Sequence, residues 1–403
     1  MKAVVQQIGA RMDYGVPLAL YHADGLARLV TDLHFEKPHR LKQLQRYSSG
    51  IPSSLVSRNN TQGLAYRAVL SHGGRKAWPH IKIAEEMAAR SLKAVRETGA
   101  DIVYGFDTAM LPSLDRLRDE GVMIVLEQCI APRAQFIEAM SRMRQGIERR
   151  GLSIDLSDLE NEISFARIMG EVEQAEWAFA DRIYCPSGFV ADAVQSCGIP
   201  TEKTRIVPYG VTVDTKAAHH KPSGARPRVT FCGRFSWRKG ALEYGALAAA
   251  LRKEADFEVL GSVALPEDVI AAVAVDVRFQ GHLNRADYRR TLAQSDVMVL
   301  PSYSEGSATV VYEAMALGVP CVVSAESGSV ITHGEDGMIV KAGDEEQLIA
   351  TVAKLLCDPA KRRAMGQRAA VTAQSYTREN YGHRLVEALR EDFAAYEKSA
   401  RAT

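Results

Sequence analysis

The sequence lacks the features that mark membrane-spanning, disulfide-linked or metal-dependent proteins. No stretch approaches the roughly 20 consecutive apolar residues of a membrane-spanning helix. The six cysteines are scattered without C-x-x-C spacing, and the ten histidines form no metal-ligand pattern. A net charge of +1 gives no general reason to expect binding to nucleic acid. These absences favour a protein of the reducing cytoplasm, with Cys232 and Cys321 as buried free thiols in apolar runs.

The composition is that of an ordinary globular protein, and the length is that of two domains. Hydrophobic residues make up 46% and charged residues 25% of the chain, both typical of soluble proteins. A chain of 403 residues is too long for a single core, so two domains of roughly 200 residues each are expected. The N-terminus lacks the apolar core of a signal peptide, and residues 2–6 are instead expected to form a first strand.

Short apolar runs alternate with helical patterns along most of the chain. This alternation predicts an α/β fold with parallel sheets covered by helices. The predicted strands include residues 102–104, 122–126, 229–232, 257–260, 297–300 and 320–323. The predicted helices include residues 62–72, 80–98, 111–118 and one long helical region over about 135–180.

A polar segment, residues 214–228, separates two such alternating patterns and is predicted to cross between the domains. We therefore predict two Rossmann-like, doubly wound domains, residues 1–213 and 214–379. The last helix, about 380–403, is expected to pack back on the first domain. Two α/β domains joined in this way form a cleft, and ligands are expected where the carboxyl ends of the strands face it.

Residues 301–318 carry the clearest chemical signal. A polar loop containing a glycine follows a buried apolar strand, and the pattern becomes helical from Ala308. The first N–H groups of a helix have no partner within the helix and tend to bind anions. The amides of Gly306, Ser307 and Ala308 are therefore expected to bind a diphosphate.

Two carboxylates, Glu305 and Glu313, bracket this anion site. Carboxylates accept hydrogen bonds from sugar hydroxyls but repel phosphate, so we interpret Glu305 as a contact to a sugar and Glu313 as a contact to a ribose. An isolated pair of acids with this spacing would more often be two solvated side chains. A second loop, described next, favours the functional interpretation of the two acids.

The loop from Gly233 to Gly240 also follows a predicted strand, at the same edge of the same sheet. Gly233 would allow close approach of the backbone to a ligand. Arg234 offers a planar fork of donors and Lys239 a point charge, and both suit a diphosphate. The two loops are predicted to supply cations and helix amides to one anion.

With these motifs in place, the chain resembles the retaining, nucleotide-sugar-dependent glycosyltransferases of family 4, which have the two-domain GT-B fold. Any one of the motifs is weak, but four in this order are specific. The matching segments are Cys185-Pro-Ser-Gly-Phe-Val, Val207-Pro-Tyr-Gly-Val-Thr-Val-Asp214, Gly233-Arg234 with Lys239-Gly240, and Glu305-Gly-Ser-Ala-Thr-Val-Val-Tyr-Glu313.

The resemblance implies hexosyl transfer that needs no metal and no cofactor besides the nucleotide-sugar donor. Arg234 and Lys239 would bind the donor's diphosphate and stabilise the leaving nucleotide, Glu305 would hold the donor sugar, and Glu313 the ribose. The catalytic residues would be Glu305, Arg234 and Lys239. The other donor-binding residues implied are Gly233, Gln280, His282, Gly306, Ser307, Ala308 and Thr309.

The first half departs from the family pattern in two places, Gly9-Ala10-Arg11 and Glu127-Gln128-Cys129. Family members often have two adjacent glycines at the first place and a histidine at the second. Asp107, Glu127 or Gln128 could contact the acceptor or the sugar, and we assign none of them as a base.

Three other classes of function were weighed. A hydrolase with Glu305 and Glu313 as its acid/base pair is disfavoured, because cations at Arg234 and Lys239 oppose the raised pKa that its acid needs. A nucleotide-sugar epimerase or a weakly active nucleotide-sugar-binding scaffold remains as the alternative. We expect a UDP- or GDP-linked donor and a glycan, lipid-linked or small-molecule acceptor, in cell-envelope or exopolysaccharide synthesis. A cytoplasmic location with peripheral membrane contact fits such acceptors.

Overall fold

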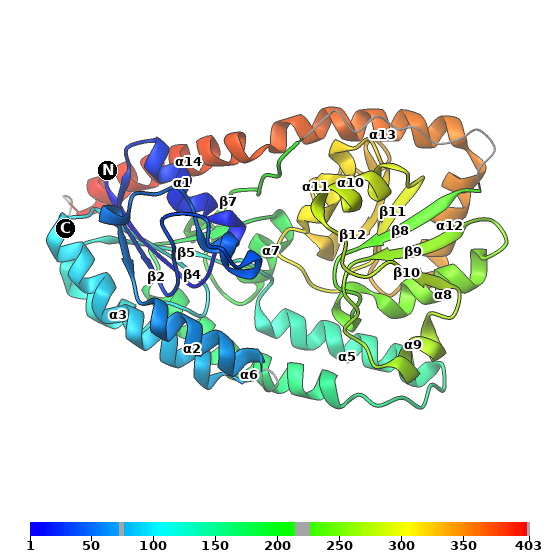
Figure 1. The fold of residues 1–403 in the computed structure, drawn as a ribbon, viewed down its shortest axis with the longest axis horizontal. Helices are drawn as coiled ribbons and strands as arrows, with labels where there is room; N and C mark the ends of the chain where they lie inside the picture. The colour runs from blue at the N-terminus through cyan, green and yellow to red at the C-terminus, as the bar shows by residue number, and fades with distance from the viewer. Residues whose placement is uncertain (72–75, 214–225, 401–403) are drawn as a thin grey trace.

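The computed structural model describes residues 1–71, 76–213 and 226–400, in two α/β domains set side by side along the long axis (Figure 1). Most of the predicted crossing segment, 214–228, and the last residues of the predicted terminal helix lie outside the described residues. The predicted fold class, two doubly wound parallel-sheet domains, is confirmed by the two sheets.

Within the described residues, the first sheet has seven parallel strands in the order β3-β2-β1-β4-β5-β6-β7. The order reverses direction next to β1, which is the switch point of a doubly wound sheet. The strands are β1 Ala3–Gln7, β2 Leu26–Thr31, β3 Val56–Arg58, β4 Ile102–Phe106, β5 Met123–Glu127, β6 Arg182–Cys185 and β7 Thr204–Ile206.

The second sheet, again within the described residues, has six parallel strands in the order β10-β9-β8-β11-β12-β13. Its switch point lies between β8 and β11, the strands that precede the two predicted ligand loops. The strands are β8 Arg228–Cys232, β9 Asp256–Leu260, β10 Val277–Phe279, β11 Val297–Leu300, β12 Cys321–Ser324 and β13 Gly337–Val340.

Helices cover the faces of both sheets (Figure 1). Those before the second sheet are α1 Gly15–His22, α2 Asn60–Ser71, α3 Trp78–Thr98, α4 Leu111–Leu117, α5 Arg133–Arg149, α6 Ser157–Phe179 and α7 Gly188–Ser196. The remaining ones are α8 Ala241–Leu251, α9 Glu267–Val273, α10 Arg285–Ala293, α11 Thr309–Ala316, α12 Glu345–Cys357, α13 Pro359–Ala373 and α14 Arg378–Ala400. None of the described helices is both long and apolar enough to cross a membrane.

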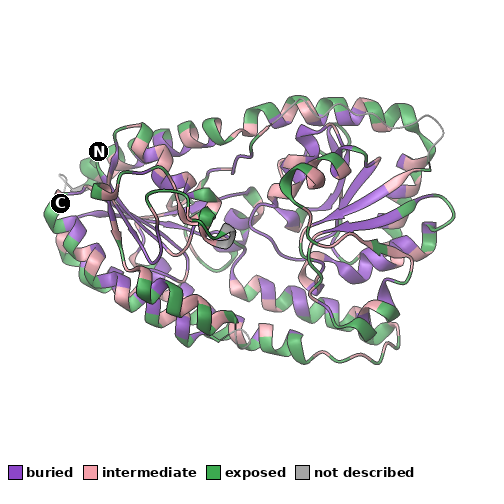
Figure 2. Ribbon diagram, viewed as in Figure 1, coloured by how far each residue is buried: buried purple, intermediate pink, exposed green. Residues whose placement is uncertain are grey.

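The sheets form the buried interior of each domain, and exposure is concentrated on the outer helix faces (Figure 2). Central strands such as β4, β5 and β11 are buried along their whole length, as expected for parallel strands covered on both faces. The predicted buried free thiols at Cys232 and Cys321 are confirmed.

The predicted long helical region over about 135–180 is helical in the structure, but a break at residues 150–156 divides it into two helices. α5 ends at Arg149 and α6 begins at Ser157. Gly151 has φ +63°, a left-handed conformation that favours glycine and is common just after a helix. The short strand β3 was also missed, since it has only three residues inside a stretch that reads as irregular.

The α5–α6 hairpin comes from the first half of the chain but packs against the core of the second domain. Phe136, Met140, Met143 and Ile147 of α5 belong to the same buried apolar cluster as Leu242 of α8. The buried residues of the first half of α6 (Leu159, Ile163 and Ala166) belong to it too. The hairpin therefore connects the two domains through apolar packing.

The last helix, α14, returns to the first domain. Leu385 and Leu389 are fully buried in the same cluster as Val16 and Leu20 of α1. α13 and α14 together run along one side of both domains, with the C-terminal part beside α1 (Figure 1). The chain therefore passes between the domains a second time at this side.

Candidate active site

The loop between β11 and α11 is almost entirely enclosed by protein. Glu305 is 9% exposed and Ser307 is 8% exposed. The Glu305 N–H donates to the carbonyl oxygen of Glu326 at 2.9 Å, and the Ala308 N–H donates to that of Ser327 at 3.0 Å. The Ala308 N–H is thus hydrogen-bonded within the protein, so the prediction that it binds a diphosphate is wrong.

Other amides of this loop differ from that of Ala308. Within the described part of the chain, the N–H groups of Gly306, Ser307 and Thr309 make no hydrogen bond. Thr309 is the first residue of α11, where N–H groups have no partner within the helix, and Gly306 and Ser307 lie just before it. The helix N-terminus therefore keeps the character of an anion site.

The cationic loop after β8 lies directly against the Glu305 loop. Gly240 has φ +80°, and a Cβ there would overlap the carbonyl oxygen of Pro301. The Tyr303 N–H donates to the carbonyl oxygen of Arg238 at 2.8 Å. A glycine is required at 240 because the two backbones touch there.

Glu305 forms ion pairs with two cations of that loop. Lys239 Nζ lies 2.5 Å from Glu305 Oε1, and Arg238 Nη1 lies 2.8 Å from the same oxygen. Burial by itself would raise the pKa of Glu305, but the charges of Arg238 and Lys239 outweigh it and hold this pKa below its usual value. Glu305 is therefore an ionised acceptor at neutral pH.

Arg234 is placed differently from Lys239. It is exposed and lines a cavity of about 740 Å³ together with first-domain residues that include Arg11 and Thr108. No ion pair joins Arg234 to Glu305 among the residues described. Gly233, with φ +111°, lies next to the Lys239 side chain, whose Cε would be 3.7 Å from a Cβ there.

Glu313 lies on α11 and is hydrogen-bonded to Tyr288 of α10, whose hydroxyl donates to Glu313 Oε2 at 3.0 Å. Burial raises the pKa of Glu313, although Tyr288 and Arg285, Arg289 and Arg378 lower it. Tyr288 was not found from the sequence, because a lone tyrosine in a polar helix carries no distinguishing signal.

Gln280 and His282, which the resemblance implies as donor-binding residues, follow β10. The Gln280 side chain is already used inside the domain, since its Nε2 donates to Glu258 Oε2 at 2.9 Å. His282 is exposed. The implied contact to the donor would therefore fall to the backbone of this segment or to His282.

The Glu305 loop also touches the first domain. The Ala131 N–H donates to the carbonyl oxygen of Glu305 at 3.2 Å, and Ser187 Oγ donates to that of Gly306 at 2.6 Å. A Cβ on Gly306 would overlap the carbonyl oxygen of Cys129. Ser187 is also the N-cap of α7, with Oγ accepting from the Val190 N–H at 3.3 Å.

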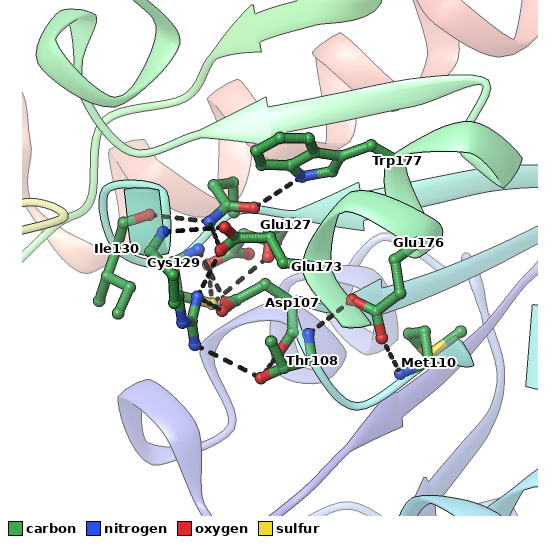
Figure 3. A network of polar contacts seen from close by, with 11 residues as sticks. Asp107, Thr108, Met110, Glu127, Cys129, Ile130, Glu173, Glu176 and Trp177 are labelled. Carbon is green, nitrogen blue, oxygen red and sulfur yellow. Dashed lines mark hydrogen bonds and ion pairs between the residues drawn. The ribbon is translucent and has the colours of Figure 1, made fainter. Parts of the chain in front are cut away.

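Across the cleft, a buried polar network lies behind the ends of β4 and β5 (Figure 3). Arg133 is at its centre, with Nη1 at 2.5 Å from Asp107 Oδ2 and at 2.6 Å from Glu173 Oε1. Burial would raise the pKa of Asp107, but Arg133 and Arg11 outweigh it and lower this pKa. Asp107 lines the cavity, yet both its oxygens are engaged by protein donors.

Glu127 and Gln128 are engaged inside the protein rather than open to a ligand. Glu127 accepts from the hydroxyls of Tyr104 at 2.5 Å and Tyr209 at 2.6 Å, and burial raises its pKa. Gln128 donates to Glu173 at 2.7 Å and accepts from Trp177 at 2.9 Å. Both side chains are therefore used in hydrogen bonds within the first domain.

Thr108, which lines the cavity, has φ +61°. This conformation is costly for a β-branched residue, by about 1–3 kcal/mol. Glu176 holds it in place, accepting from the N–H groups of Thr108 and Met110, both at 2.6 Å, and burial raises the pKa of Glu176 to about 8.

The network residues on α6 could have been found from the sequence. Glu173 and Glu176 occupy buried positions of a face whose other buried residues include Ile163, Ala166 and Met169. Acidic side chains at such positions need partners. Arg133 and Arg238 gave no comparable signal, because an arginine at a helix start or in a turn is ordinary.

Residues 226–358 match the family of group 1 glycosyl transferases. A Campylobacter jejuni protein, N,N'-diacetylbacillosaminyl-diphospho-undecaprenol alpha-1,3-N-acetylgalactosaminyltransferase, is 30% identical over 157 residues, 38% of this chain and 41% of that protein. The GDP-mannose-dependent monoacylated alpha-(1-6)-phosphatidylinositol monomannoside mannosyltransferase of Corynebacterium glutamicum is 32% identical over 157 residues, 36% of this chain and 41% of that protein. The chain thus spans about two fifths of these relatives.

Solved structures match over nearly the whole chain. HepE of Anabaena in complex with UDP has a TM-score of 0.62 at 17% identity, covering 97% of this chain and 100% of that one. An alpha,alpha-trehalose-phosphate synthase (UDP-forming) of Burkholderia vietnamiensis has a TM-score of 0.64 at 16% identity, covering 98% and 99%. At these identities the likeness concerns the fold, which is the two-domain architecture of glycosyltransferases.

Proposed function

We propose that this protein is a retaining glycosyltransferase of family 4, which transfers a sugar from a nucleotide-diphosphate sugar to a hydroxyl acceptor without a metal ion. The observation that carries the proposal is the pairing of Glu305 with Lys239 and Arg238 beside the N-terminus of α11. In this proposal the contact between the two loops combines a carboxylate for the sugar with cations and amides for the phosphates. The match of residues 226–358 to group 1 glycosyl transferases supports it.

In this proposal the donor spans the edge of the second sheet. Arg234 and Lys239 bind the diphosphate together with the amides of Gly306, Ser307 and Thr309. Glu313, supported by Tyr288, holds the ribose, and Glu305 holds the donor sugar. Cleavage of the glycosidic bond places negative charge on the diphosphate, so fixed cations there stabilise the transition state more than the ground state.

The acceptor enters from the cavity between the domains. Arg11 and Thr108 reach this cavity from the first domain, and Arg234 reaches it from the second. The relatives named above act on a diphospho-undecaprenol and on a phosphatidylinositol mannoside. A glycan or lipid-linked acceptor of cell-envelope or exopolysaccharide synthesis is therefore our proposal for this chain, with transfer at the cytoplasmic surface of a membrane.

The test is a thermal-shift screen against UDP, GDP, ADP and their common sugar conjugates, with and without EDTA. A ligand of the folded state raises the unfolding midpoint by mass action. We expect one nucleotide family to stabilise the protein, with no effect of EDTA. Loss of the shift in EDTA would contradict the metal-free site, and no shift with any donor would contradict the proposal.

Product analysis then separates the alternatives. Incubation with the stabilising donor should release nucleoside diphosphate, and the transferred sugar should keep its anomeric configuration by NMR. A new nucleotide sugar as the product would indicate an epimerase. Binding without turnover, with extracts of membrane lipids and glycans offered as acceptors, would favour the scaffold reading.

A further inference from the structure

Arg238 connects the two donor-side loops through both its backbone and its side chain. Its carbonyl oxygen accepts from the Tyr303 N–H at 2.8 Å. Its Nη1 donates to the carbonyl oxygen of Ser304 at 2.5 Å and lies 2.8 Å from Glu305 Oε1. Three consecutive residues of the Glu305 loop are therefore held by one arginine.

The contacts of the Arg238 side chain distinguish it from Arg234 and Lys239. Arg234 is exposed and lines the cavity, whereas Arg238 and Lys239 do not line it. Arg238 differs from Lys239 because its guanidinium also donates to the carbonyl oxygen of Ser304. The planar guanidinium suits the fixed geometry of one carbonyl and one carboxylate. Arg238 is thus used by the protein itself.

The charges explain why Glu305 needs a second cation. A carboxylate next to a diphosphate is repelled by it, and Lys239 carries only one charge to share between the two. Arg238 adds a second positive charge, which remains paired with Glu305 when Lys239 binds a phosphate. With Arg234 included, the loop contributes three cations against one carboxylate, which leaves two positive charges for the two singly charged phosphates of a diphosphate diester.

We propose that Arg238 is a positioning residue that keeps Glu305 ionised and oriented toward the donor sugar while Lys239 contacts the diphosphate. The inference rests on the proposed function, since it names how the sugar-binding carboxylate of that site is held. Arg238 acts through Glu305 and touches no substrate.

The experiment is a double-mutant cycle of Arg238→Gln and Glu305→Gln. The assay is slow hydrolysis of UDP-glucose, UDP-N-acetylglucosamine or GDP-mannose, whichever the wild type turns over. We expect Arg238→Gln to lower kcat by roughly 10- to 100-fold, as for other supporting residues of a site, with little change in the Kd of the nucleoside diphosphate. The double variant should be no slower than Glu305→Gln alone, because both changes remove one interaction.

Two further variants complete the design. Arg238→Lys keeps a cation near Glu305 and should recover most of kcat, and it decides the matter if Arg238→Gln does not fold. Arg290→Gln is the matched control, because Arg290 lies in the same domain with its side chain 71% exposed, and it should behave as wild type.

The inference is overturned by any of three results. Multiplicative losses in the double variant would show that Arg238 acts independently of Glu305. If Arg238→Gln lost as much nucleotide affinity as a substitution of Arg234 by Gln, Arg238 would be a phosphate ligand. An unchanged kcat in Arg238→Gln, or a kcat in Arg238→Lys no higher than in Arg238→Gln, would show that Arg238 does not position Glu305. A wild type that binds and hydrolyses none of the donors would instead overturn the proposed function, and this inference with it.

Discussion

At the scale of single residues, the proposed donor site is organised by charge around Glu305. One carboxylate receives two cations, and the third cation, Arg234, faces the cavity between the domains. The residues differ in burial as well as in direction, because Glu305 is enclosed while Arg234 is exposed. Changes at the two positions should therefore have different consequences.

Arg234→Ala should weaken binding of the nucleoside diphosphate without destabilising the fold. An exposed side chain without an ion pair among the described residues contributes within about 0.5 kcal/mol to stability, whereas a charge-assisted contact to phosphate is worth about 1.5–3 kcal/mol. Calorimetric titration should show a Kd roughly 10- to 100-fold higher at an unchanged melting temperature. An unchanged Kd would place the phosphate site elsewhere.

The lowered pKa of Glu305 has a consequence for the pH dependence of turnover. A carboxylate whose folded-state pKa is depressed contributes stability above its usual value of 4.5 and loses it as the pH falls through the depressed value. Glu305 therefore stays ionised below pH 4.5, and its protonation should not limit donor hydrolysis by the wild type at that pH. In Arg238→Gln the acid limb of the kcat profile should move upward.

The groups that face Glu305 decide the sign of that shift. The charged side chains that act on the Glu305 carboxylate are Arg238 and Lys239, both from one loop, while Glu326 and Cys129 contact the Glu305 loop through their backbone carbonyl oxygens. Only the first two are cations, so removing one must raise the pKa of Glu305. An acid limb that stays in place or moves downward would contradict the assignment.

At the scale of elements, the structure agrees with the sequence wherever hydrophobic period and turn chemistry act together. The strand before each ligand loop, the start of α11 and the N-cap at Ser187 could all be predicted, because each depends on local sequence. The break between α5 and α6 could not, since the sequence on both sides favours helix and only Gly151 marks the change. β3 depends on pairing with β2, which no local pattern shows.

The contact of the Glu305 loop with the first domain gives a prediction for this element. Gly306→Ala should strongly reduce turnover and lower stability, because the new Cβ would overlap the carbonyl oxygen of Cys129 and push the loop away. Hydrolysis rates and melting temperatures of the variant report both effects. We expect a loss of at least about 1 kcal/mol in the free energy of unfolding.

Gly188→Ala serves as the comparison for this variant. Gly188 begins α7 beside the same interface, but a Cβ there meets no atom within 4 Å. It should leave turnover unchanged and should not destabilise the protein. Equal behaviour of the two alanine variants would mean that the loop tolerates displacement.

The candidate site shows the same division between local and distant information. Arg234, Lys239, Glu305 and Glu313 follow strands or begin a helix, and local motifs bring them to one sheet edge. The network around Arg133 joins side chains far apart in the chain, such as Asp107 and Glu173. Its partners depend on how α6 crosses the strand ends, and that packing is fixed by tertiary structure.

At the scale of the whole molecule, the α5–α6 hairpin joins the two cores. Apolar side chains of α5 and of the first half of α6 are buried with the second domain, while Glu173, Glu176 and Trp177 of the same α6 belong to the first. Opening the cleft as two independent bodies would expose the apolar face of the hairpin. Motion between the domains is therefore expected to bend α6 or to shift the hairpin with the second domain.

This coupling predicts that the domains unfold together. Met143→Ala removes a fully buried side chain of the hairpin and should cost about 2–5 kcal/mol. In urea, hydrogen exchange should report the same loss of protection in the strands of both sheets. Separate transitions, with only one sheet affected, would show that the hairpin does not couple them.

The hairpin also limits how such a protein can be recombined with a relative. A chimera joined at the crossing between the domains would keep the α5–α6 segment of one parent and place it on the core of the other. Its apolar side chains (Phe136, Met140, Met143 and Ile147) would meet a surface shaped for different partners. A working exchange of donor specificity would have to carry residues 133–166 together with the second half of the chain, although the two are not contiguous. The segments that must be exchanged together are therefore neighbours in space but separate in the sequence, so a single crossover in the gene cannot transfer them.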